Sequence, residues 1–197
     1  MKLKSTILLF IFFPFFLLSD DTLNSSRLFI EKLGDKVIAD VADPNLNENI
    51  RANNFKKLYV SSFDIKYISK FVLGRHWKKL DNKTREKFYD TFTDYIVLVY
   101  APKFKGWKGK FSTIEANKVQ ANMIMVQMNL INKQTAPTLK LDWRISFNKY
   151  NKFKILDVNI DGVSMLVTQR AEFSSVIKNN PKGVIGLIEL MDKKNKS

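Results

Sequence analysis

The residues that could carry chemistry are few in this chain of 197 residues. Cysteine is absent and there is one histidine, His76, so thiol nucleophiles and zinc sites built from cysteine and histidine are excluded. No serine stands in a G-x-S-x-G elbow, and neither G-x-G-x-x-G nor the P-loop string occurs. We therefore interpret His76 as a structural or surface residue, and expect no catalytic residue, no metal and no cofactor.

Three carboxylates, Asp142, Asp157 and Asp161, are the residues from which paired acids for glycoside chemistry could be assembled. Each stands where polar residues alternate with apolar ones, as on the wet face of a β-strand. That pattern makes them ordinary strand residues, so an enzyme is the weaker hypothesis and a binding function the stronger one.

The first residues look like an export signal. Lys2 and Lys4 precede an unbroken apolar run, residues 7–18, which ends at a small residue, Ser19. The run is too short to span a bilayer comfortably, since about 20 apolar residues are needed. We prefer a signal peptide over residues 1–19 to an uncleaved anchor. Residues 20–197 then form a single exported domain.

The formal net charge of +14 is large for a chain of this size. A basic surface attracts nucleic acid, an anionic membrane or an acidic protein, and export makes nucleic acid the least expected of these partners. Lys103, Lys105, Lys108 and Lys110 are candidates for such a surface. The alternative is that the lysines only solvate ordinary surface.

The elements that must position these residues change character along the chain. Apolar residues recur at helical spacing over about 24–102, and strictly alternating residues follow, most clearly over 139–147. Helical spacing returns over about 164–192. The sequence predicts an α+β fold, with a four-stranded antiparallel sheet over about 107–163 covered by N-terminal and C-terminal helices. The predicted strands are 107–117, 119–131, 139–147 and 153–160.

The strand around Met123 and Met125 is apolar on both faces, because Ile124, Val126 and Met128 form the other row. Methionine suits walls that adapt to variable apolar shapes, so this strand is compatible with a pocket. From the methionines alone, a strand sandwiched between two helical layers is the preferred interpretation.

Several motifs together resemble a known family. They are Phe63-Asp64, Val72-Leu73-Gly74-Arg75 with Trp77, Asp142-Trp143-Arg144, and the run FKILDVNIDGVS at 153–164. In this order, and over nearly the whole exported part, the chain resembles the MlaC family of periplasmic phospholipid-binding proteins, also called toluene-tolerance proteins. It departs from the family pattern at His76, where tyrosine is usual, at Thr168-Gln169, and in its basic tail.

The resemblance implies a periplasmic carrier, not an enzyme, that holds one phospholipid as cargo with its acyl tails in an apolar cavity between sheet and helices. It also implies exchange with two partners: an inner-membrane MCE-domain protein of an ABC transporter and an outer-membrane lipoprotein–porin complex. Such a system maintains the lipid asymmetry of the outer membrane. A monomer is expected, with no nucleic acid bound.

The residues that we expect to line this lipid cavity come from the predicted helices, the predicted strands and the segment after the last strand. They are Phe71, Val72, Trp77, Tyr95, Val99, Met123, Met125, Met128, Trp143, Val163, Met165 and Leu166. Two other hypotheses remain: a ligand-free periplasmic interaction module with a basic docking face, and, third in order, a hydrolase that uses Ser164 or His76.

Overall fold

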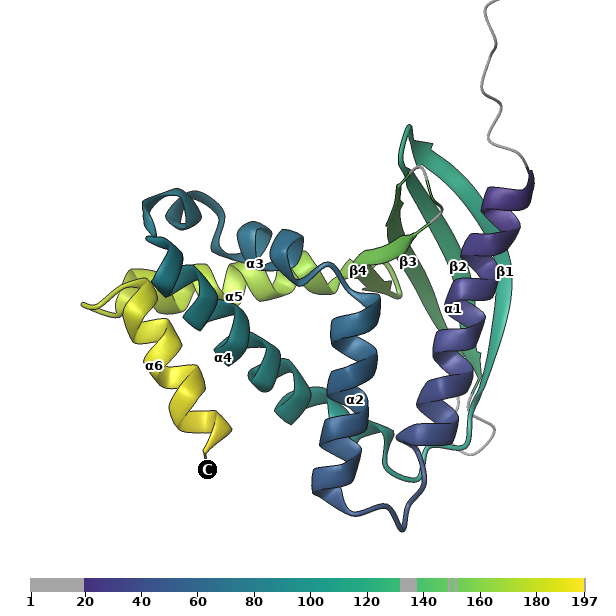
Figure 1. The fold of residues 1–197 in the computed structure, drawn as a ribbon, viewed down its shortest axis with the longest axis horizontal. Coiled ribbons are helices and arrows are strands. Elements are labelled where there is room, and N and C mark those ends of the chain that lie inside the picture. The colour runs from purple at the N-terminus through teal and green to yellow at the C-terminus, as the bar shows by residue number, and fades with distance from the viewer. Residues whose placement is uncertain (1–19, 132–137, 149, 151, 197) are drawn as a thin grey trace, which may run out of the picture.

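The computed structural model of the protein describes residues 20–131, 138–148, 150 and 152–196. The predicted signal peptide, residues 1–19, lies outside this described part. The described chain has an α+β fold, with helices before and after an antiparallel sheet (Figure 1). Within these ranges, no helix combines the length and the hydropathy needed to cross a membrane.

The helices before the sheet begin at the capping residues that the sequence offers. Asp64 accepts a hydrogen bond from the Tyr67 amide at 2.9 Å, and Asp81 accepts one from the Thr84 amide at 2.7 Å. The elements are α1 (Asp20–Asp40), α2 (Glu48–Ser62), α3 (Ile65–Leu73), η1 (Gly74–Lys79), α4 (Asn82–Tyr100) and η2 (Ala101–Phe104).

Helix α1 begins at Asp20, one turn before the helical region that was expected from about residue 24. The early turns bury small polar residues, Thr22 and Ser26, in place of aliphatic ones. Ser26 satisfies its hydroxyl by donating to the Leu23 carbonyl at 2.7 Å. A helix that packs through such residues has no apolar stripe there for the sequence to reveal.

The sheet has five strands in the order β1-β2-β3-β4-β5, all antiparallel, where four were predicted. The additional strand pairs only two residues with the end of its neighbour, which is too short for an alternating pattern. Irregularities in the register of the β1–β2 and β3–β4 pairs bend the sheet. The strands are β1 (Lys110–Gln120), β2 (Met123–Ile131), β3 (Leu139–Phe147), β4 (Phe153–Ile160) and β5 (Val163–Ser164).

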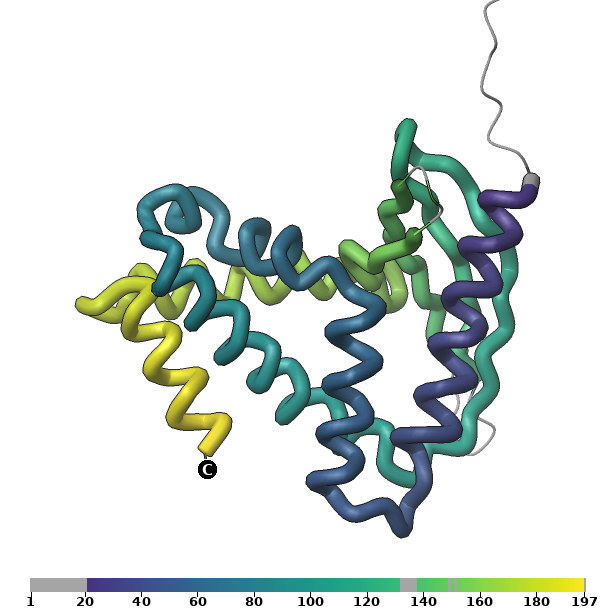
Figure 2. Tube along the Cα trace, viewed as in Figure 1, coloured from purple at the N-terminus to yellow at the C-terminus, as the bar shows by residue number. Residues whose placement is uncertain are grey.

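Two helices follow the sheet, α5 (Met165–Asn179) and α6 (Val184–Asn195). Ser164 caps α5, because its Oγ accepts from the Val167 amide at 3.0 Å. After α5 the chain turns back, and α6 runs beside α4 (Figure 2). Asn195 fixes the end of α6 by donating to the Thr91 carbonyl at 3.0 Å.

Two separate groups of buried side chains stabilise this arrangement. The sheet core joins α1 to the inner face of the sheet and includes Ile30, Ile124 and Ile145. The helical core joins α3, α4, α5 and α6 and includes Phe88 and Phe173. In Figure 1, α1 lies along the sheet at the right of the molecule, and α3 to α6 gather at the left. Helix α2 stands between these two groups.

Candidate functional site

An apolar cavity of about 290 Å³ lies between the sheet core and the helical core and is partly open to the surface. All the major elements except α6 contribute to its wall. The lining residues are Ile30, Leu33, Gly34, Val37, Phe55, Leu58, Tyr59, Phe63, Ile68, Val72, Phe92, Ile96, Tyr100, Phe104, Phe111, Met128, Leu130, Leu141, Trp143, Leu156, Asp157, Val158, Ile160, Met165, Leu166 and Gln169.

The inner face of the sheet supplies one side of the wall. In β2 the alternation buries Ile124, Val126 and Met128 on this face and leaves Met123 and Met125 half-buried on the other. Gly34 allows α1 to approach β1 closely, because a Cβ at this position would lie 2.7 Å from the Phe111 ring. The wall on this side is therefore formed by direct contact between helix and sheet.

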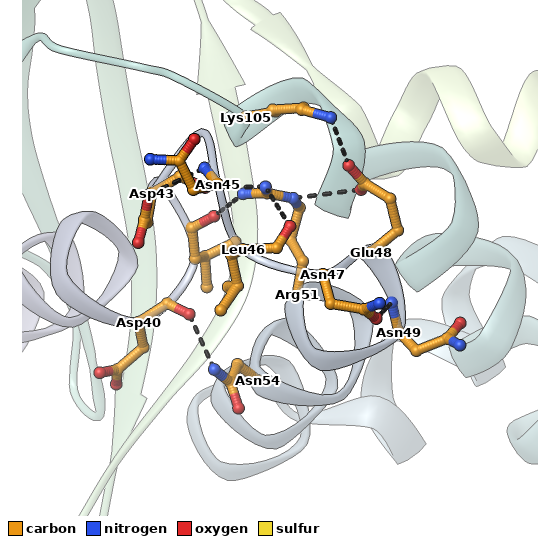
Figure 3. Close-up of polar contacts among 11 residues, drawn as sticks. Asp40, Asp43, Asn45, Leu46, Asn47, Glu48, Asn49, Arg51, Asn54 and Lys105 are labelled. Atoms are coloured by element: carbon orange, nitrogen blue, oxygen red, sulfur yellow. Dashed lines mark hydrogen bonds and ion pairs between the residues drawn. The ribbon is translucent and has the colours of Figure 1, made fainter.

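A buried arginine organises one end of the cavity. Arg51 on α2 is fully buried, and its guanidinium donates to the carbonyls of Val41, Asp43 and Leu46 in the turn between α1 and α2 (Figure 3). Its Nε also pairs with Glu48 at 3.1 Å. A buried cation is tolerated when its donors are satisfied in this way.

The same network reaches the connection between helices and sheet. Glu48 accepts from Lys105 at 2.8 Å, and this hydrogen bond is the main reason that the pKa of Glu48 lies below its usual value. The Gly106 amide donates to the Ala42 carbonyl at 2.8 Å. The α1–α2 turn and the segment after α4 are thus held together next to the cavity end lined by Phe55 and Phe104.

Polar groups on the cavity wall are scarce. The carboxylate of Asp157 is already occupied, since it accepts from the Leu166 amide at 3.0 Å and from the Ser164 hydroxyl at 2.6 Å. Gln169 donates to Glu172 at 3.0 Å. Two phenols, Tyr59 and Tyr100, and the indole of Trp143 also lie on the wall, and burial raises the pKa of both phenols.

The residues predicted for a lipid cavity divide into two groups. Val72, Met128, Trp143, Met165 and Leu166 line the observed cavity. The structure places the others outside this wall: Phe71, Trp77, Tyr95, Val99, Met123, Met125 and Val163.

Each residue outside the wall has a structural reason for its place. On α4 the cavity side is formed by Phe92, Ile96 and Tyr100, one helical turn apart, whereas Tyr95 and Val99 do not line the cavity. Tyr95 packs near Phe173 of the helical core. Val163 is 55% exposed.

Phe71 and Trp77 pack against cations away from the cavity. The Arg170 guanidinium lies 5.1 Å from the Phe71 ring, and that of Arg85 lies 5.0 Å from the Trp77 ring. Met123 and Met125 lie on the outer row of β2, as described above. The spacing of apolar residues in these helices and strands therefore predicted their inward-facing side with an error of about one residue.

Sequence reasoning missed most of the contribution of α1 and α2. Ile30, Leu33 and Val37 stand at helical spacing in the sequence, but were not assigned to the cavity. Tyr59 was not singled out because the apolar pattern of α2 is weak. The signal that was available is the run of aromatic residues from Phe55 through Tyr59 to Phe63.

Ser164 and His76 have different surroundings, so the geometry of a hydrolytic pair is not formed. The Ser164 hydroxyl donates to Asp157. His76 lies on η1 beside a basic surface pocket that Arg75 and Arg170 also line. Burial and then the nearby cations Arg75 and Lys79 lower the pKa of His76.

An α+β fold with a concave, almost wholly apolar cavity between two cores defines a protein with a site for an apolar ligand. A sequence profile described as MlaC protein matches residues 31–193. The chain therefore belongs to the MlaC family.

Two similar proteins agree with this assignment. The chain is 28% identical over 179 residues to the intermembrane phospholipid transport system binding protein MlaC of Haemophilus influenzae, covering 85% of this chain and 80% of that protein. A phospholipid-binding protein from Ralstonia solanacearum, solved in complex with a phospholipid, has the same fold. Its TM-score is 0.75 at 22% identity, over 86% of this chain and 96% of that one.

Proposed function

We propose that this protein is a phospholipid carrier that holds one phospholipid by its acyl tails in the cavity between the two cores. The main support for the proposal is the composition of the cavity wall. Aliphatic and aromatic side chains from α1 to α5 and from four strands enclose one continuous apolar space. The phospholipids named for the two similar proteins support this choice of ligand.

A carrier of this kind binds its phospholipid reversibly and does not react with it. Removing on the order of thirty methylene groups from water at ~0.8 kcal/mol each is strongly favourable, but a bilayer offers the lipid nearly the same environment. Exchange between the cavity and a membrane can therefore lie near balance. The direction of transport is then set by the partners.

The proposal includes a place and partners for the carrier. After export directed by residues 1–19, a monomer moves through the periplasm. It exchanges lipid with an inner-membrane MCE-domain protein of an ABC transporter and with an outer-membrane lipoprotein–porin complex. This traffic maintains the lipid asymmetry of the outer membrane. The resemblance to the family supports each of these roles.

The first test is native mass spectrometry of the exported protein, purified without detergent, with organic extraction of the bound material. We expect an adduct of one phospholipid per chain. Val158→Trp should abolish the adduct, because Val158 lines the cavity and the larger side chain fills it. Val60→Trp is the matched control, because Val60 is 47% exposed and does not line the cavity.

Two outcomes would contradict the carrier. One is a bare protein that also takes up no lipid from liposomes, which would favour an interaction module with a basic docking face. The other is an adduct that Val158→Trp and Val60→Trp retain equally, which would place the lipid outside this cavity.

A further inference from the structure

Two tyrosines bring hydroxyl groups to an otherwise apolar wall. Tyr59 of α2 and Tyr100 at the end of α4 both line the cavity. Tyr59 is only 6% exposed, and Tyr100 is half-buried. Neither hydroxyl has a hydrogen-bond partner among the residues that the structure describes. A buried phenol normally has one, so this pair is unusual.

The Tyr59 hydroxyl is not sealed inside the protein. The indole Nε1 of Trp143, also on the wall, is enclosed by protein atoms without a partner, whereas the Tyr59 hydroxyl keeps access to free space. Because the whole side chain is so little exposed, the cavity that it lines is the free space beside it. A bound molecule is therefore the partner that this hydroxyl can reach.

The two phenols lie near each other on the cavity wall. They are close enough for the Tyr100 phenol to contribute to the raised pKa of Tyr59. Glu172, an exposed residue of α5, contributes likewise to the raised pKa of Tyr100. Glu172 also accepts from the wall residue Gln169 at 3.0 Å. Tyr100, which is half-buried, thus lies on the side of the cavity that faces an exposed carboxylate.

A diacyl lipid that enters this cavity brings few acceptors to the two hydroxyls. Hydrocarbon tails offer no acceptor, and the head group belongs outside, so the ester carbonyls at the junction are the acceptors that arrive there. We propose that the hydroxyls of Tyr59 and Tyr100 donate hydrogen bonds to the ester carbonyls of the bound lipid. They fix how deeply it sits, and they favour ester-linked over ether-linked lipids. This inference rests on the proposed phospholipid carriage.

The test compares two lipids in one vesicle. Delipidated protein is incubated with vesicles containing equal amounts of dioleoyl phosphatidylethanolamine and its di-O-oleyl ether, which lacks the carbonyls. The lipid bound to the protein is then extracted and quantified by mass spectrometry. Because every variant meets the same vesicles, any difference in how readily the two lipids leave the bilayer cancels between variants.

We expect wild type to bind a higher ester-to-ether ratio than Tyr59→Phe with Tyr100→Phe. Each hydrogen bond should account for about two- to tenfold. Each single variant should lie between these two. The phenyl ring preserves the packing of Tyr59 on Phe63, whose ring centroid is 4.8 Å away, so loss of fold is not expected. Tyr67→Phe, at a residue 37% exposed and off the wall, should keep the wild-type ratio.

Equal ratios in wild type and the double variant would overturn the role of the tyrosines while leaving carriage intact. Failure of wild type to take up either lipid would instead overturn carriage, and this inference with it. Thermal unfolding of each variant confirms that the proteins compared are folded.

Discussion

Arg51 shows how one charged side chain can determine the shape of an apolar site. Its guanidinium donates to three carbonyls of the α1–α2 turn, of which that of Asp43 also accepts from the Leu46 amide at 3.2 Å. We predict that Arg51→Ala lowers the free energy of unfolding by about 3–5 kcal/mol, because the three carbonyls lose a charged donor. Lys56→Ala removes an ion pair with Asp94 whose side chains are 47% and 46% exposed, and should cost under about 1 kcal/mol. Equal losses in urea titrations would refute the special role of Arg51.

At the scale of elements, Asp157 joins the sheet to helix α5. It is a buried residue of β4 that accepts hydrogen bonds from both Ser164 and Leu166 where the helix begins. Asp157→Ala should lower the free energy of unfolding by about 1.5–3 kcal/mol and reduce lipid loading, because Leu166 lines the cavity. Asp192→Ala, which removes a surface pair with Lys196 at the end of α6, is the control and should leave loading unchanged. Unaltered stability and loading in both variants would show that Asp157 does not seat α5.

For the whole molecule, the position of the cavity between two cores predicts a strong link between cargo and stability. A ligand that binds only the folded state at 100 to 1,000 times its dissociation constant adds about 3–4 kcal/mol. Delipidation should therefore lower the melting temperature in calorimetry by about 5–15 °C. Val158→Trp, with its cavity filled, should melt at the same temperature before and after the same treatment. A wild-type melting temperature that delipidation leaves unchanged would contradict this link.

Much of the fold followed from local patterns. The aspartates at 64 and 81 and the serine at 164 cap the helices that the sequence predicted, and the alternation at 139–147 is strand β3. These features depend on residues close in the chain, which is why sequence reveals them. Strand β5 was not predicted, because two residues are too few to show an alternating pattern.

The site was less predictable, because periodicity shows which side of an element faces inward but not whether the space there is filled. On α4, Phe88 is core while Ile96 lines the cavity, although both belong to one apolar stripe. Arg51 could not be recognised either. A lone arginine in a polar helix usually points to solvent, and its burial here depends on how the α1–α2 turn folds around it.

Phe63 packs against both the sheet core and the helical core, and its backbone pairs with Ile155 of β4. It therefore lies at the boundary between two groups of side chains that are each packed within themselves, and the cavity follows this boundary. Separating the two groups there would loosen contacts along the cavity wall and leave the packing inside each core unchanged. We expect guests of different girth to be accommodated in this way, with no repacking inside either core.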